Sequence, residues 1–142
     1  MRVDIKGVTD LGRKRPINED SHAWLIPKGS PERERLGILL VVADGMGGAN
    51  AGERASRLAV ETVIKSYGES RGPEPLANLQ LALEAANAAV HDESQQNQNL
   101  SGMGTTCTAV VIKGADLLLG HVGDSRVYLV RNGSINQLTH DH

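Results

Sequence analysis

The chain has 142 residues, of which 39% are hydrophobic and 23% charged, and its formal net charge is −2. Because Lys and Arg do not outnumber Asp and Glu, the charge balance argues against a nucleic-acid partner or an anionic membrane partner. Aromatic residues make up only 2% of the chain, which argues against surfaces that stack bases or sugars. The length suits one domain with a core of Val, Ile, Leu and Ala.

The single cysteine, Cys107, rules out an internal disulfide. It lies in a run typical of a strand, so we expect a small buried side chain rather than a nucleophile. Residues 1–6 lack the apolar stretch of a signal peptide, and the longest apolar run, 38–43, is far too short to cross a membrane. We therefore expect a cytoplasmic protein.

The first elements predicted along the chain are strands. Short alternating runs over 3–8 and 21–26 indicate two strands on either side of a polar, charged loop. A polar stretch covers 27–35. The run from Ile38 to Ala43 is continuously apolar and rich in β-branched residues, which is typical of a strand buried on both faces.

Two adjacent helices are predicted next. Apolar and small residues recur at three- and four-residue spacing over 55–67 and again over 76–90. Asn50 followed by Glu53 resembles the capping arrangement at the start of a helix. The segment 71–75, with its two prolines, separates the helices, and the polar tract 92–99 is predicted to be a fraying end or a loop.

The last part of the chain is predicted to form an antiparallel meander. Strands over 105–112 and 116–122 flank a short connection that contains Gly114. Strands over 126–131 and 134–138 flank Asn132-Gly133, a strong hairpin signal because both turn positions need a positive φ. Strands, then two helices, then a meander favour an α+β fold over an alternating βαβ sheet.

Acidic and glycine residues gather at three predicted strand ends, over 10–20, 43–48 and 120–126. Asp44 ends a buried strand and is followed by a loop with three glycines, an arrangement of oxygen ligands that suits Mg²⁺ or Mn²⁺. One Cys and five scattered His argue against a structural zinc site. Each segment taken alone is compatible with an ordinary turn or a polar loop. Their joint occurrence is what favours a site.

Five motifs in a fixed order resemble the bacterial-type branch of the type 2C metal-dependent serine/threonine protein phosphatases. They are Asp10-x-Gly-x-x-Arg-x-x-Asn-Glu-Asp20, Val42–Gly48, Gly104–Thr106, Gly123–Arg126 and Leu138–His142. The resemblance implies that residues 1–142 are the N-terminal portion of a single phosphatase domain. It also implies an α+β fold with a central antiparallel β-sandwich flanked by helix pairs and a metal site at one end.

The resemblance further implies two Mn²⁺ or Mg²⁺ ions and a third, weaker metal site. Asp44 resembles the aspartate that bridges both metals, and Gly45 resembles the residue that lends its carbonyl to the second. Glu19 and Asp20 resemble the acidic pair that holds this second metal directly or through its water shell. Asp124 resembles the aspartate that helps to hold the third metal.

Arg15 aligns with the arginine that grips the substrate phosphate, a task suited to a planar guanidinium. The implied reaction is hydrolysis of a phosphomonoester by a metal-activated water, with no phosphoenzyme. Met46 stands where animal members often carry a histidine, and methionine cannot donate a proton to the leaving group. The implied substrate is a phosphoprotein, such as a serine/threonine kinase or its target.

Family catalytic domains are longer and carry two further aspartates that ligate the first metal, so we expect a truncated form with weak or no activity. The alternative is a non-catalytic phosphatase-like module that binds a phosphoprotein or another partner. A glycine-rich nucleotide-binding domain fits less well, because the loop 45–48 lacks the Lys-Ser/Thr of a P-loop and a βαβ context.

Overall fold

The computed structural model describes residues 2–48 and 50–142, which form a five-stranded sheet and a separate two-stranded hairpin. The strands are β1 (Asp20–Leu25), β2 (Ile38–Met46), β3 (Gly104–Thr105), β4 (Cys107–Lys113), β5 (Asp116–Val122), β6 (Tyr128–Arg131) and β7 (Ser134–Gln137). The helices are α1 (Ser30–Leu36), α2 (Ala51–Gly68) and α3 (Pro75–Gln96), followed by the 3-10 helix η1 (Gln98–Leu100). The predicted α+β class is confirmed.

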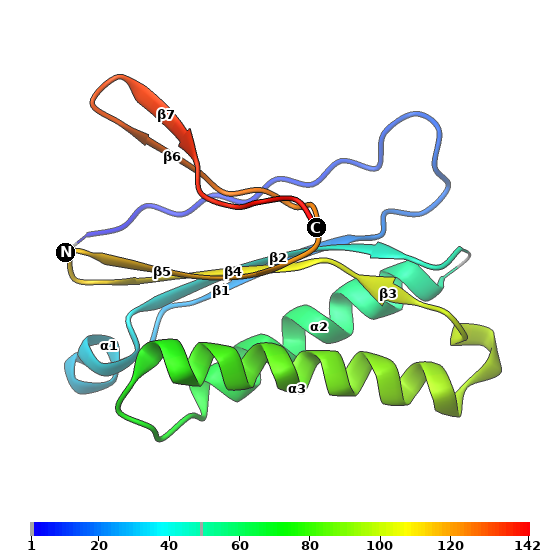
Figure 1. The fold of residues 1–142 in the computed structure, drawn as a ribbon, viewed down its shortest axis with the longest axis horizontal. Helices are drawn as coiled ribbons and strands as arrows, with labels where there is room; N and C mark the ends of the chain where they lie inside the picture. Colours follow the sequence, from blue (N-terminus) through cyan, green and yellow to red (C-terminus); the bar gives the residue numbers. More distant parts are fainter. Residues whose placement is uncertain (1, 49) are drawn as a thin grey trace.

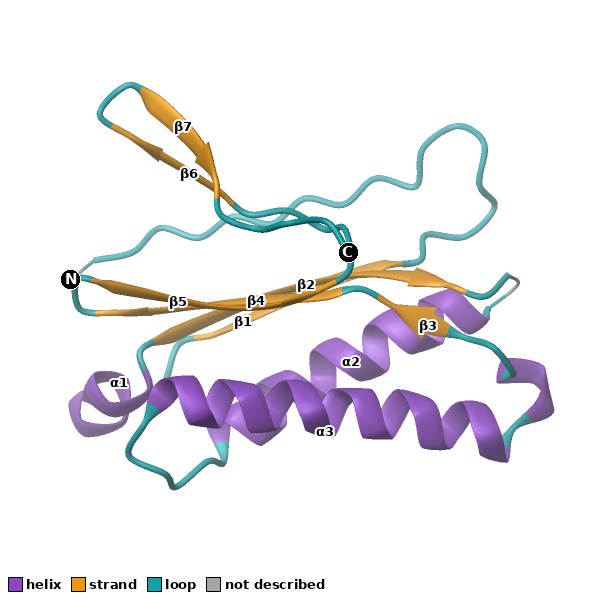
Figure 2. Cartoon of the chain, in the orientation of Figure 1, coloured by secondary structure: helices purple, strands orange, loops and turns teal. Residues whose placement is uncertain are grey.

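The helices lie on one side of the sheet, and the β6–β7 hairpin lies on the other (Figures 1 and 2). Helix α2 packs on β1 and β2, while α3 packs against α2 and reaches β4 and β5. The second layer of the expected sandwich consists, within the described residues, of this hairpin and the extended segment 2–19. No helix in the part of the chain that the structure describes is both long enough and apolar enough to span a membrane.

All strand pairs in the sheet are antiparallel, in the order β1-β2-β4-β5, and β3 pairs with the end of β2. Strand β2 is therefore central. Its register with β1 places Asp20 directly opposite Asp44. This pairing brings two of the predicted metal ligands to the same end of the sheet, although they are far apart in the chain.

Alternation along β2 decides which side chains enter the core. Leu39, Val41 and Ala43 are buried against the helices, whereas Val42 points to the opposite face and is 43% exposed. The prediction that this run is buried on both faces is therefore wrong at Val42, although Ile38 on the same face is buried. Helices cover only one face of the sheet, so the alternate residues of β2 near Asp44 stay open.

One further local prediction is wrong, and one helix forms where no element was predicted. Residues 3–8 form no strand, because this segment crosses the open sheet face near His22 and Trp24 and does not pair with an edge. Most of α1 lies in the polar stretch 27–35; this helix has Pro31 in its first turn and buries Leu36 at its end. Both outcomes depend on tertiary contacts that the local pattern does not contain.

The helix predictions are confirmed in position but differ at the ends. Asn50 occupies the N-cap of α2 without a side-chain capping bond, and Glu53 instead pairs with Arg57 at 3.0 Å. Helix α3 continues through the first half of the polar tract and ends at Gln96. The Asn132-Gly133 turn has the predicted geometry, with φ angles of 53° and 75° at its two central residues.

Tyr67 is the largest fully buried side chain, and its hydroxyl donates a 2.6 Å hydrogen bond to the carbonyl of Leu36. Burial raises the pKa of Tyr67 from 10.0 to about 12, so folding favours the neutral phenol. The stability that results is complete below pH 10 and is lost as the pH rises towards 12.

We expect Tyr67→Phe to lower the free energy of unfolding by about 1–3 kcal/mol at pH 7 and to remove this loss of stability at alkaline pH. Urea unfolding at pH 7, 9 and 11 measures both, and equal pH dependence in the two proteins would contradict the assignment.

Cys107 is 7% exposed, and burial raises the pKa of its thiol from 9.0 to about 11. The prediction of a small buried side chain is confirmed. At pH 8 the folded chain should hold about 100-fold less thiolate than the unfolded chain. We expect iodoacetamide to label Cys107 about 100-fold more slowly in buffer than in urea. Rapid labelling of the folded chain would show that the thiol is accessible.

Candidate functional site

Asp44 and Asp20 form a carboxylate pair where β1 and β2 meet at the end of the sheet. Both residues are exposed on the open sheet face. Burial and the neighbouring Asp20 raise the pKa of Asp44, and Asp124 adds a smaller effect in the same direction. Arg15 opposes the shift. The structure therefore brings four of the predicted site residues into one electrostatic neighbourhood.

A tight corner of backbone lies behind this pair. The N–H of Gly45 donates a 2.9 Å hydrogen bond to the carbonyl of Glu19, which ties β2 to the segment before β1. A Cβ on Gly45 would overlap the carbonyl of Gly52, and a Cβ on Gly52 would lie 2.7 Å from Cδ of Glu19. The two glycines therefore allow β2, the first turn of α2 and the Glu19 side chain to meet.

Sequence reasoning missed Gly52. The available signal was a glycine at the second position of a helix, where alanine is intrinsically preferred by about 1 kcal/mol. Such a residue indicates that something packs closely against the helix at that point. Here the neighbours are the Glu19 carboxylate and Gly45.

Arg15 stands at the rim of the site. Its Nη1 lies 4.0 Å from Oε2 of Glu19, and its side chain is 66% exposed while that of Glu19 is 16% exposed. An ion pair with one partner this exposed contributes little to stability. The Arg15 guanidinium therefore remains available to an anionic ligand.

Thr106, the residue before β4, holds the backbone of Asp44 through two hydrogen bonds. Its Oγ1 accepts a 2.9 Å hydrogen bond from the N–H of Asp44, and its own N–H donates to the carbonyl of Asp44 at 2.9 Å. The same hydroxyl lies 2.7 Å from Oγ of Ser125, next to Asp124. The Gly104–Thr106 motif therefore connects Asp44 to the loop that carries Asp124.

A cavity of about 510 Å³ opens beside the carboxylate pair. Its walls combine the extended N-terminal segment, the strands β1 and β2 and the loop after β5. They include residues 5–10, 20–24, 40–44 and 125–126. A ligand of small to moderate size can therefore reach the carboxylate pair through this cavity.

The carboxylates of the site meet part of what a divalent cation requires. Two adjacent carboxylates supply hard oxygen ligands, and a cation between them would relieve the repulsion that raises the pKa of Asp44. Within residues 2–48 and 50–142, however, no three His, Cys, Asp or Glu side chains form a group that could hold a metal ion. The chain fits such an ion as a partial site, which further oxygen ligands would complete.

The family model described as protein phosphatase 2C matches residues 13–142. The chain belongs to the protein phosphatase 2C family. It is 44% identical to the serine/threonine protein phosphatase PstP of Mycobacterium tuberculosis over 94% of this chain and 24% of that protein.

Solved protein phosphatase 2C structures share the fold. The serine/threonine phosphatase Stp1 of Staphylococcus aureus superposes with a TM-score of 0.82 at 30% identity, over 95% of this chain and 52% of that one. The catalytic domain of PstP in complex with two manganese ions superposes with a TM-score of 0.75 at 40% identity, over 92% and 52%. The chain thus spans about half the length of these two solved phosphatases.

Proposed function

We propose that residues 1–142 are the N-terminal portion of a protein phosphatase 2C domain that hydrolyses phosphoserine and phosphothreonine in proteins. The observation that carries the proposal is the Asp20–Asp44 pair at the mouth of a cavity, with Arg15 close by. Relatives named as serine/threonine phosphatases support it, as does the solved relative with two manganese ions.

In this proposal Asp44, Gly45, Glu19 and Asp20 would hold two Mn²⁺ or Mg²⁺ ions. Asp124 would contribute to a third, weaker site. When bound, such ions supply positive charge and an activated water for attack on a phosphomonoester.

The residues of the chain itself would then bind and orient the substrate. Arg15 would hold two phosphoryl oxygens through its planar guanidinium and align the phosphorus for in-line attack. Met46 is 59% exposed at the end of β2 and offers no proton, so it would not protonate the leaving group. Thr106 would keep Asp44 in place through both backbone hydrogen bonds.

The proposed partner is a phosphoprotein, and a serine/threonine kinase or its target is the specific class we propose. The balance of charges supports a protein substrate over nucleic acid or an anionic membrane surface. The cytoplasmic location stays a prediction from sequence.

Phosphate release from a phosphothreonine peptide tests the proposal. We expect slow hydrolysis by the chain that requires Mn²⁺ and is lost in Asp44→Asn and Arg15→Ala. Asp116→Asn serves as the matched control, because Asp116 is an exposed aspartate in the β4–β5 hairpin, at the far end of β5 from Asp124. Hydrolysis that persists in EDTA, or that Asp44→Asn leaves unchanged, would contradict the proposal. Turnover equal to that of a full-length family domain would refute the expected weak activity.

The second candidate is a non-catalytic phosphatase-like module. It is favoured by the observation that the described residues bring together two carboxylates and no third metal-binding side chain. Calorimetry separates the two candidates. Binding of Mn²⁺ that Asp44→Asn abolishes supports the enzyme, whereas binding of the phosphopeptide without Mn²⁺ binding or phosphate release supports the module.

A further inference from the structure

Asp124 lies on a short loop that has no regular structure of its own. The segment Gly123–Arg126, called the Asp124 loop below, makes up most of the connection 123–127 between β5 and β6, and Asp124 itself is exposed. A side chain on such a loop can serve a site only if other parts of the chain hold the loop. The residues that do so are therefore candidates for a role in the site.

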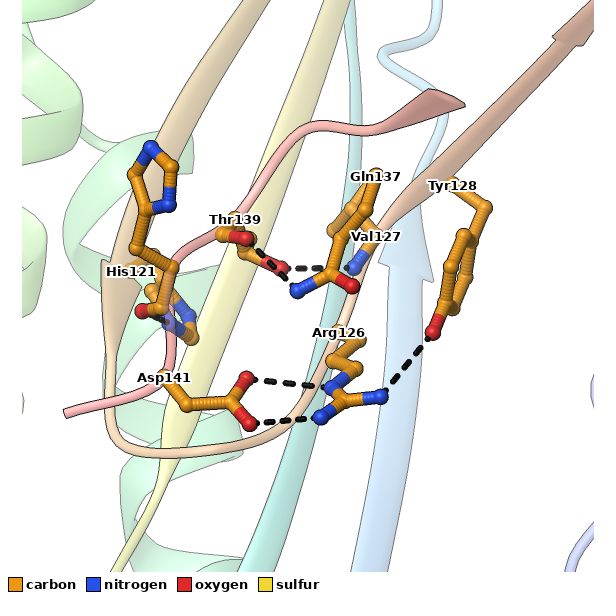
Figure 3. Close-up of polar contacts among 8 residues, drawn as sticks. His121, Arg126, Val127, Tyr128, Gln137, Thr139 and Asp141 are labelled. Carbon is orange, nitrogen blue, oxygen red and sulfur yellow. Dashed lines mark hydrogen bonds and ion pairs between the residues drawn. The ribbon is translucent and has the colours of Figure 1, made fainter. Parts of the chain in front are cut away.

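The end of the chain lies against this loop. The N–H of His142 donates to the carbonyl of Gly123 at 3.0 Å, and the N–H of Gly123 donates to Nδ1 of His142 at 3.1 Å. Asp141 receives two hydrogen bonds from the guanidinium of Arg126, from Nε at 3.0 Å and from Nη2 at 2.6 Å (Figure 3). Both ends of the Asp124 loop are thus held by consecutive residues, Asp141 and His142.

Further contacts keep this terminal segment on the sheet. Thr139 is buried, and its Oγ1 accepts a 3.2 Å hydrogen bond from the N–H of Val127 (Figure 3). The ring of His121 in β5 bridges the sheet and the terminal segment, with Nδ1 2.8 Å from Oγ1 of Thr108 and Nε2 3.1 Å from the carbonyl of His140. Residues 138–142 therefore form an ordered strap along the end of β5.

The opposite side of the loop is held against Asp44. Ser125 meets the Thr106 hydroxyl at 2.7 Å, and that hydroxyl accepts the N–H of Asp44. Gly123 has a φ of +106°, and a Cβ there would lie 2.6 Å from Cγ2 of Thr106. The Asp124 loop is therefore fixed between Thr106 on one side and two residues of the strap, Asp141 and His142, on the other.

We infer that Asp141 and His142 are positioning residues that clamp the Asp124 loop beside Asp44. This inference rests on the proposed function for its consequence, which is that Asp124 stays within reach of the metal site. It also assigns a role to the Leu138–His142 motif, for which the catalytic scheme has no other use.

Exposure of the clamp supports a local role over a global one. The side chains of Arg126 and Asp141 are 48% and 39% exposed, and an ion pair of this kind contributes little to overall stability. Its two parallel hydrogen bonds do, however, fix the orientation of the guanidinium and of the backbone that carries it. Loss of Asp141 should therefore loosen the loop and leave the fold intact.

Amide hydrogen exchange of the metal-free chain tests the clamp directly. We expect Asp141→Asn and His142→Ala to speed exchange of the two hydrogen-bonded amides in 123–127, those of Gly123 and Val127, by about 10-fold or more, with the amide of Ala109 in β4 unchanged. The control is Glu32→Gln, which removes a similar exposed ion pair with Arg35 in α1 and should leave the loop unaffected. The swapped pair Arg126→Asp with Asp141→Arg should restore part of the protection.

Calorimetry with Mn²⁺ on the same variants tests the consequence for the site. We expect the affinity to fall about 10-fold in Asp141→Asn, as is usual when a residue that supports a metal ligand is lost. Unchanged exchange at 123–127 would overturn the inference, and so would faster exchange with unchanged Mn²⁺ affinity. A fall in affinity without faster exchange would instead make Asp141 a direct ligand. If the unmodified chain binds no Mn²⁺, the proposed function fails, and the exchange experiment still decides whether the clamp exists.

Discussion

Replacing Gly45 by alanine is expected to destabilise the chain by about 3 kcal/mol or more, because the added methyl group has no space. The new Cβ would overlap the carbonyl of Gly52 and would lie 3.0 Å from the carbonyl oxygen of Glu19. Both neighbours are backbone atoms and cannot turn away as a side chain would. The end of β2 would have to move away from the first turn of α2, which would also break the 2.9 Å hydrogen bond between Gly45 and Glu19.

Urea unfolding followed by circular dichroism measures this loss. Gly104→Ala is the matched control, because Gly104 pairs with Met46 at the same end of β2 and a Cβ there meets only the Met46 side chain, at 3.7 Å. That variant should change stability by less than about 1 kcal/mol. Similar losses in the two variants would mean that any side chain at this end of the sheet is harmful, and the specific role of Gly45 would be wrong.

Replacing Asp44 by asparagine is expected to have opposite effects on the metal-free chain and on metal binding. Without metal, the substitution removes a charge that is disfavoured by partial desolvation and by the neighbouring Asp20, so the variant should be more stable than the original chain at pH 7. The pKa of Asp44 is raised above 3.8 in the folded chain, so its ionised form disfavours folding at neutral pH. This penalty disappears as the pH falls through the raised pKa, and Asp44→Asn should lack that dependence.

With Mn²⁺ the order should reverse. An ion that binds only the folded chain stabilises it by about 2.7 kcal/mol at a concentration 100 times its Kd. Asp44→Asn should lose this gain, since loss of a supporting residue alone weakens a metal site 10- to 100-fold and loss of a ligand should cost more. Thermal unfolding with and without Mn²⁺ at pH 7 measures both effects, with Asp116→Asn as the control. A variant that Mn²⁺ still stabilises fully would exclude Asp44 as a ligand.

Substitutions at Gly45 and Asp44 are expected to change the stability of the metal-free chain in opposite directions. Gly45 meets a steric requirement, so its replacement is expected to destabilise the fold whether or not a metal is bound. Asp44 supplies a charge, and its replacement is expected to stabilise the metal-free chain. A residue that lowers the stability of the empty protein is typical of a position retained for binding or catalysis.

Local sequence information was enough for much of the fold. The spacing of apolar residues over 55–67 and 76–90 predicts α2 and α3, since a helix face is built from residues three and four apart. Asn132-Gly133 predicts its own hairpin, because both residues tolerate the positive φ that the turn requires. The assignment to the phosphatase family also came from local motifs and agrees with the match over residues 13–142.

Other elements depended on partners that are distant in the chain. Residues 3–8 have the pattern of a strand, but a strand needs an edge to pair with, and here the segment lies across the sheet face. Helix α1 is short and polar, and its buried residue, Leu36, contributes to a core formed by other elements. Whether Val42 is exposed depends on what covers the second sheet face, which no pattern within β2 can specify.

The same division applies to the site. The family resemblance alone predicts the site residues Arg15, Glu19, Asp20, Asp44, Gly45 and Asp124, and their residue types set the chemistry of oxygen ligands and a phosphate-binding cation. Only the tertiary structure places Asp20 opposite Asp44, through the β1–β2 register. It alone reveals the contacts of Gly52, Thr106, Asp141 and His142, because each of these contacts joins residues that are many positions apart in the chain. Chemistry follows from the side chain, whereas proximity follows from how the sheet and helices pack.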